Sequence, residues 1–266
     1  MKPSASAKDW LPLAATQAPA GEPPSGQAFQ TEWIDFERGI RVGHLEPHER
    51  ITQILKFHLE TTYGTPFVTD RWGRGVYWQW ICWLPKANRL AKPISHDVNF
   101  GCAKFFITVS QTERRFKCGL QIERGYAAGP EPFPGCLLKK DWDWHRLVRQ
   151  CKAGSVVDRE LLRLLTQDDF VAEVGDWEAN AVFTARNFRS AADVRRALVK
   201  YAANEWMGFQ LYYAMPARDV KSCSGYELVK AILGVFAEVT PAMNACMQVR
   251  LDARESRPLG LRGRKP

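Results

Sequence analysis

The string Asp141-Trp-Asp143-Trp-His145 has the residue types of a metal or acid–base site. Two carboxylates and an imidazole can ligate a divalent metal or exchange a proton with a substrate. In a strand all three would share one face, whereas in a helix only Asp141 and His145 would. Because the residues that follow repeat with helical spacing, we expect Asp141 or Asp143 to be a helix N-cap above the two Trp. A metal or catalytic site is the less favoured interpretation.

A metal-dependent nuclease or hydrolase would need more acidic and basic groups on neighbouring strands, to hold a cation and a water. Gln121-Ile-Glu123, with Lys104 and Lys117 nearby, supplies some of them, but no Asp/Glu-x-Lys occurs in the predicted strands. The sequence also lacks a phosphate loop, a dinucleotide-binding Gly pattern and a serine-nucleophile elbow. An enzyme of unrecognised class, built on this face or around the string 141–145, remains the alternative hypothesis.

Basic and aromatic side chains interleave most densely between Arg71 and Lys92. Aromatic faces that stack bases, beside cations that contact phosphates, are typical of single-stranded or flipped-base recognition. The competing interpretation is a Trp-rich core strand with charged ends. Both interpretations apply in part if the strand in this segment has one apolar face and one polar face. The residues that we predict to bind nucleic acid are Arg71, Arg74, Tyr77, Trp83, Lys104, Lys117 and Gln121.

Three segments with a period of two indicate an antiparallel meander with one buried face, over residues 76–84, 102–109 and 116–124. We expect the inward side chains to be Val76, Trp78, Trp80, Phe105, Ile107, Leu120 and Ile122. We expect the outward side chains to be Tyr77, Gln79, Trp83, Lys104, Lys117, Gln121 and Glu123. The polar face of this sheet is therefore the candidate site.

Helical spacing and capping residues predict helices around the meander. They cover residues 47–63, 143–151 and 156–165, a segment opened by Ser190, and a segment opened by the Ser224–Glu227 capping box and stopped by Pro241. Further strands are expected at residues 170–174, 181–186 and 208–215. Because helices and strands do not alternate regularly, the predicted class is α+β, an antiparallel meander with flanking helices in one compact domain.

The ends of the chain differ in composition from its middle. Residues 1–30 are rich in Pro, Ala, Gly and Ser, which predicts a disordered tail before a single domain at residues 31–250. Residues 251–266 hold five basic and two acidic residues, which predicts a basic flexible tail. The net charge of +8 favours an anionic partner such as nucleic acid. The tails could also recruit protein partners.

The seven cysteines are scattered singly, without a Cys-x-x-Cys pair, which argues against a structural zinc site and favours a reducing compartment. No apolar run approaches the roughly 18 residues of a membrane span. The sequence therefore predicts a cytoplasmic protein without a metal, another cofactor or a membrane partner. Together with the polar sheet face, this favours a nucleic-acid-associated binding module or accessory subunit.

Overall fold

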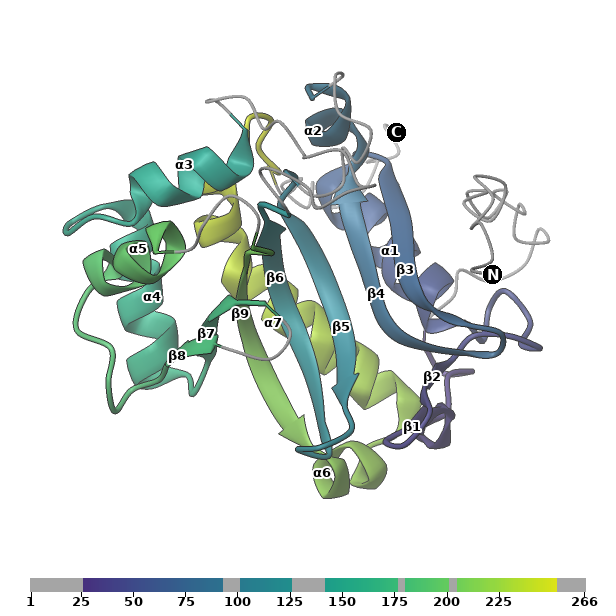
Figure 1. Cartoon of the computed structure of the whole chain (residues 1–266). Coiled ribbons are helices and arrows are strands. Elements are labelled where there is room, and N and C mark those ends of the chain that lie inside the picture. Colours follow the sequence, from purple (N-terminus) through teal and green to yellow (C-terminus); the bar gives the residue numbers. More distant parts are fainter. Residues whose placement is uncertain (1–25, 93–100, 126–141, 177–179, 201–204, 253–266) are drawn as a thin grey trace, which may run out of the picture.

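The computed structural model describes residues 26–92, 101–125, 142–176, 180–200 and 205–252 (Figure 1). Nine strands pair in one antiparallel sheet within these residues. The strands are β1 Ile34–Asp35, β2 Gly39–Arg41, β3 Phe67–Arg74, β4 Tyr77–Pro85, β5 Lys104–Ser110, β6 Arg115–Glu123, β7 Val171–Gly175, β8 Asn180–Phe183 and β9 Gly208–Pro216. The helices are α1 Ile51–Tyr63, α2 Lys86–Leu90, α3 Asp143–Gln150, α4 Val156–Gln167, α5 Ala191–Val199, α6 Ala217–Ser222 and α7 Gly225–Cys246.

The sheet order is β1-β2-β4-β5-β6-β9-β7-β8, with β3 paired to the side of β4. Strands β4, β5 and β6 are the predicted meander, and the strands expected near residues 170–174 and 181–186 are β7 and β8, which pair antiparallel. The α+β class with flanking helices is therefore confirmed. Strand β3 was not predicted, because its sequence Phe-Val-Thr-Asp-Arg-Trp-Gly-Arg does not alternate between apolar and polar residues.

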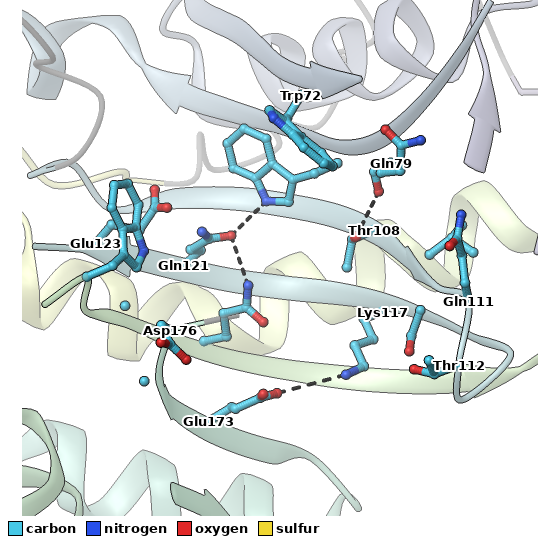
Figure 2. Close-up of a pocket in the computed structure, with 17 residues that line it drawn as sticks. Trp72, Gln79, Thr108, Gln111, Thr112, Lys117, Gln121, Glu123, Glu173 and Asp176 are labelled. Atoms are coloured by element: carbon cyan, nitrogen blue, oxygen red, sulfur yellow. Dashed lines mark hydrogen bonds and ion pairs between the residues drawn. The ribbon is translucent and has the colours of Figure 1, made fainter. Parts of the chain in front are cut away.

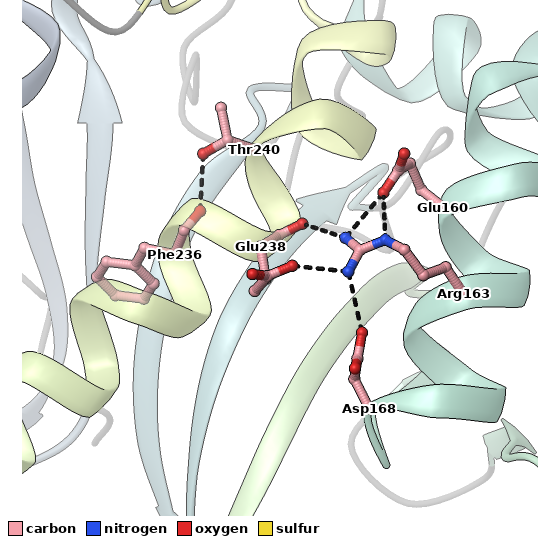
Figure 3. A network of polar contacts seen from close by, with 6 residues as sticks. All are labelled: Glu160, Arg163, Asp168, Phe236, Glu238 and Thr240. Carbon is pink, nitrogen blue, oxygen red and sulfur yellow. Dashed lines mark hydrogen bonds and ion pairs between the residues drawn. The ribbon is translucent and has the colours of Figure 1, made fainter.

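Helix α7 lies along one face of β5, β6 and β9, with α1 and α4 on either side of it (Figure 1). Phe236 of α7 stacks on Phe105 of β5 at 4.7 Å between ring centroids, and Trp83 of β4 lies 6.0 Å from the same ring. Arg163 of α4 holds α7 from the side, donating to the Glu238 carboxylate at 2.7 Å and to the Glu238 carbonyl at 3.3 Å (Figure 3). The main core thus lies between α7 and one face of the sheet.

The Ser224–Glu227 capping box of α7 is present, as predicted. The predicted stop at Pro241 is wrong, because the helix continues to Cys246. Proline removes the donor to the carbonyl four residues earlier, which is Ala237. Both Pro241 and Ala237 are exposed, so water can satisfy this carbonyl.

By length and apolar composition α7 could also span a membrane, and 39% of its most apolar window is buried against the rest of the fold.

Two residues predicted to lie in the tails, Phe29 and Leu251, pack in the core. Phe29 is 2% exposed and its carbonyl lies against Gly225 at the start of α7. Leu251 is 3% exposed, and its backbone exchanges two hydrogen bonds of 2.7 Å with the Asn244 side chain. Residues 1–25 and 253–266 lie outside the described residues.

The predicted faces of β4 hold at Trp78 and Gln79 and are wrong from Trp80 onward. Trp72 of β3 pairs with Trp80 and Gly73 pairs with Trp78, so Gln79 has no partner residue on β3. A single extra residue of this kind is a β-bulge, and it reverses the faces of the side chains that follow. Trp78 therefore lies in the main core, Trp80 turns to the opposite face, and Trp83 turns into the core with no exposed surface.

On β5 and β6 the predicted faces are confirmed. The inward side chains Phe105, Ile107, Leu120 and Ile122 lie in the main core, and Lys104, Lys117, Gln121 and Glu123 lie on the opposite face.

Candidate ligand-binding site

The face of the sheet opposite α7 carries a cavity of about 370 Å³ (Figure 2). Strands β3 to β7 and β9 contribute to its walls and floor. Trp72, Gln79 and Thr108 lie along one side of it, whereas Glu173 and Asp176 lie along the other (Figure 2). Both polar and aromatic side chains line this cavity.

One row of polar side chains crosses four strands directly. Lys104 of β5 pairs with Gln121 of β6, Gln121 pairs with Gln210 of β9, and Gln210 pairs with Glu173 of β7. Directly opposed residues of an antiparallel sheet share a face and have Cβ atoms roughly 4.5–5.5 Å apart. The row is therefore a continuous polar strip, and its last three members line the cavity.

The two amides in this row have assignable orientations. Trp80 Nε1 lies 2.7 Å from the Gln121 side chain, and an indole N–H can only donate, so Gln121 must turn its oxygen toward it. Gln210 Nε2 donates to the same oxygen at 3.2 Å. The Gln121 NH₂ group is then left as a pair of donors, and within the described part of the chain no hydrogen bond from it is found.

Two opposed glycines make the floor hollow beside this row. Gly208 of β9 pairs with Gly175 of β7, and neither has a side chain to fill the space above the sheet. A Cβ at Gly208 would lie 3.6 Å from its nearest neighbour, which is ordinary van der Waals contact. The cavity at this point therefore results from missing side chains and not from a strained backbone at Gly208.

A buried ion pair joins Lys104 and Glu123 at the same end of the cavity. The side chains are 1% and 5% exposed. Burial alone would lower the pKa of Lys104, but the Glu123 carboxylate outweighs that effect and raises it. Lys104 is thus committed to Glu123, whereas Glu123 itself lines the cavity.

Lys117 is held in a second charged cluster at the other end. Its ammonium lies 2.8 Å from the Glu113 carboxylate, 3.9 Å from Glu173 and 4.8 Å from the Tyr212 ring centroid. Tyr212 donates its hydroxyl proton to Glu173 at 2.8 Å. Burial, and then the Glu173 charge, raise the pKa of Tyr212 far above its ordinary value, so the phenol stays protonated. These contacts neutralise Lys117.

The cavity is acidic and aromatic. Of the described residues that line it, Lys117 alone carries a positive charge, against Glu123, Glu173 and Asp176. Trp72 is 68% exposed beside Trp80, and Trp206 also lines the cavity. An exposed Trp at a cavity rim offers a flat apolar surface on which a planar group can stack.

The thiols near this face do not suit nucleophilic catalysis. Cys82 and Cys102 are packed with Phe106 and Tyr212 in a small apolar cluster. Burial raises the pKa of Cys102 to about 11 and that of Cys82 well above its ordinary value. A reactive cysteine needs the opposite shift.

The structure brings together only some of the predicted nucleic-acid-binding residues. Lys117 and Gln121 line the cavity, and Lys104 lies beside them but is buried. Trp83 was predicted to be exposed; this is wrong, because it packs in the main core and donates to the Thr52 carbonyl at 3.1 Å.

The remaining three predicted residues lie on the two strands next to the β3–β4 turn and are not part of the cavity lining; they are Arg71, Arg74 and Tyr77. The Arg71 guanidinium lies 3.7 Å from the centroid of the Trp78 ring, and Arg38 lies 4.3 Å from that of Tyr77. Arg74 is exposed at the end of β3.

The site residues that the sequence did not single out include Trp72, Glu173, Gly208 and Gln210. Gln210 falls in a segment predicted as a strand, where it alternates with Phe209 and Leu211, so a polar face for that strand could have been inferred. The pairing of Gln210 with Gln121 and Glu173 could not have been inferred, because the order of the strands in the sheet is not visible in the sequence.

The second candidate, at residues 141–145, does not have the predicted arrangement. The N-cap of α3 is Trp142, whose side chain makes no capping hydrogen bond, so the N-cap prediction for Asp143 is wrong. Asp143 is instead fully buried in an ion pair with Lys92 at 2.9 Å. Asp141 lies outside the described residues, and His145 is half-buried on α3. The described residues contain no cluster of three or more His, Cys, Asp or Glu that could hold a metal.

Comparisons with family models, with curated proteins and with solved structures found no match to this chain.

Proposed function

We propose that this chain is a binding domain that takes a planar, hydrogen-bonding ring of the nucleobase class in the cavity on its open sheet face. The observation that carries the proposal is the chain of hydrogen bonds from Trp80 to Gln121 and from Gln210 to Gln121. It fixes a pair of donors on the cavity floor, and fixed polar groups are what recognise the edge of a base.

The surroundings of this amide pair support the same ligand class. The exposed Trp72 provides a stacking face, and stacking of one base on an aromatic side chain contributes roughly 1–3 kcal/mol. The glycine pair of Gly208 and Gly175 leaves room for a ring on the floor.

The charges favour contact with the base over contact with phosphate. The single ammonium on the cavity wall, Lys117, is neutralised by Glu113, and the other charged groups on the described wall are carboxylates. The base could belong to a free nucleotide or to a single strand of nucleic acid, which the net charge of +8 would attract.

Calorimetric titration of the full chain tests the proposal. The ligands are the four common nucleoside 5′-monophosphates, ribose 5-phosphate as the ligand without a base, and homopolymeric single-stranded DNA and RNA. We expect at least one monophosphate to bind and ribose 5-phosphate not to bind. Absence of binding by every base-containing ligand, or equal binding by ribose 5-phosphate, would overturn the proposal.

The salt dependence distinguishes the two sources of the base. A free nucleotide bound through its base should show a slope of log affinity against log salt near zero. A bound strand should show about −0.7 for each phosphate contacted and a higher affinity than the monophosphate.

A substitution in the floor links binding to this cavity. Gly208→Leu should weaken binding at least about tenfold, because its side chain fills the hollow, while the free energy of unfolding stays equal or rises, since glycine weakens a strand. The matched control is Gly234→Ala on α7, where a Cβ meets nothing within 4 Å. It should leave binding unchanged.

A further inference from the structure

Two groups of opposite hydrogen-bonding character project from β6 into one end of the cavity. Gln121 and Glu123 are two residues apart, so they share a face of the strand and lie about 6.6 Å apart along it. This spacing is comparable to the width of a heterocyclic base, so one ring can contact both groups.

Gln121 can offer only donors to a ligand. Its oxygen already accepts from Trp80 at 2.7 Å and from Gln210 at 3.2 Å, which uses both lone pairs. The ligand atom that faces its NH₂ group must therefore be an acceptor, such as a ring carbonyl.

Glu123 can offer only acceptors. The buried Lys104 ammonium donates to its Oε2 atom, and a carboxylate has about four lone-pair sites in total. The sites that remain can accept two parallel N–H groups, the arrangement that makes carboxylate recognition strongest. The ligand atoms that face Glu123 must therefore be donors.

We infer that the base bound in this cavity has a guanine-type edge, in which a ring carbonyl stands next to a ring N–H and an exocyclic amine. Guanine presents one acceptor and adjacent donors along this edge. Hypoxanthine has the carbonyl and the ring N–H but no amine, and adenine has no carbonyl. This inference rests on the proposed function and names the ligand class for the same site.

A guanidinium group is the strongest competitor, because it would also suit carboxylates and Trp faces. It has no acceptor, so it would leave the Gln121 donors without a partner inside the cavity, and a polar group left unpaired there costs affinity. The amide pair therefore favours the lactam edge over the guanidinium.

The test compares guanosine 5′-monophosphate with inosine 5′-monophosphate by calorimetry on the full chain. These two ligands differ only in the exocyclic amine, so their ratio of affinities isolates the contact with Glu123. We expect the guanosine form to bind about 10- to 100-fold more tightly, the range given by a hydrogen bond to a charged group. Adenosine 5′-monophosphate and free arginine should bind more weakly than the guanosine form.

The double variant Lys104→Met/Glu123→Gln tests whether the ratio of affinities for the guanosine and inosine forms depends on the Lys104–Glu123 ion pair. It removes both charges together, so no uncompensated charge stays buried and the fold should be retained. We expect the guanosine-to-inosine ratio to fall to within about twofold. Gly234→Ala should keep the ratio of the unmodified chain.

Equal affinities for the two ligands, stronger binding of arginine, or a ratio that survives in the double variant would overturn the inference while leaving base binding intact. Absence of binding by every monophosphate would instead overturn the proposed function, and the inference with it. The first comparison uses the unmodified chain, so it holds even if the double variant does not fold.

Discussion

Lys92 and Asp143 form an ion pair of 2.9 Å in which neither side chain is exposed to solvent. The three protons of the ammonium have three acceptors, since Lys92 also donates to the Asn88 carbonyl at 2.9 Å and to its side-chain oxygen at 2.8 Å. Asp143 in turn accepts from the Asn88 amide at 2.7 Å and from the backbone of Ala103 at 2.7 Å. This network ties the end of α2 to the start of α3.

Removing one partner of this pair should strongly destabilise the fold. Asp143→Asn leaves a buried ammonium without a charge partner, so we expect the free energy of unfolding to fall by about 3–5 kcal/mol. Urea denaturation measures this loss. A loss near 1 kcal/mol, as for a helix N-cap, would contradict the role given to the ion pair.

The matching double variant is Lys92→Met/Asp143→Asn. This variant removes the ammonium and keeps a side-chain oxygen at position 143 for the Ala103 N–H, so it should be more stable than Asp143→Asn alone, although two residues have changed. Urea denaturation of the two variants gives the comparison.

The sequence predicted the sheet face of the candidate site because β6 alternates cleanly. Lys117 and Gln121 are separated by Cys118, Gly119 and Leu120, and the apolar members of that alternation are buried in the structure. The helix cap at Ser224 was predictable for the same reason, because it depends only on neighbouring residues.

The parts that could not be predicted depend on pairing between distant strands. The bulge at Gln79 exists because Trp72 and Gly73 of β3 pair on either side of it. The contact between Gln121 and Gln210 depends on the register of β6 against β9, which local alternation does not specify. The ion pair of Lys104 with Glu123 likewise needs the register of β5 against β6.

The reversed parity of β4 gives a test by substitution. Trp83 has no exposed surface, so Trp83→Ala should lower the free energy of unfolding by about 3–5 kcal/mol. Trp80 is partly exposed beside the cavity, so Trp80→Ala should cost less stability. Chemical denaturation of both variants gives the comparison, and a larger loss for Trp80→Ala would contradict the bulge.

Phe29 should stabilise the fold although it lies in the segment predicted to be a tail. Its side chain is 2% exposed and meets the Trp33 ring at 5.5 Å between centroids, so we expect Phe29→Ala to cost about 3–5 kcal/mol. The exposed neighbour Gln30 is the control, and Gln30→Ala should change stability by less than about 0.5 kcal/mol. Thermal or urea unfolding measures both, and similar small effects would return residues 26–30 to the tail.

Stability should fall as the solution becomes alkaline, because the core holds several buried thiols. Burial raises the pKa of Cys118 far above its ordinary value, and it raises the pKa of Cys151 to about 12. An unfolded thiol ionises near pH 8.5, so above that pH the unfolded state binds fewer protons than the folded state. The stabilisation from each buried thiol is therefore complete below about pH 8.5 and is lost as the pH rises toward the folded pKa.

Each such thiol should contribute a loss of up to about 1.36 kcal/mol per pH unit. Cys118→Ala removes one contribution, so the fall in unfolding free energy between pH 7 and pH 10 should shrink by about 2 kcal/mol, whatever the variant costs at neutral pH. Cys223→Ala, which changes a partly exposed cysteine, is the control and should keep the full fall. Urea denaturation at a series of pH values measures the difference. Cys118 is buried in the main core, so the fall should be smaller in Cys118→Ala than in the unmodified chain. An identical fall in the two proteins would contradict the prediction, because it would mean that Cys118 ionises in the folded protein as readily as in the unfolded chain.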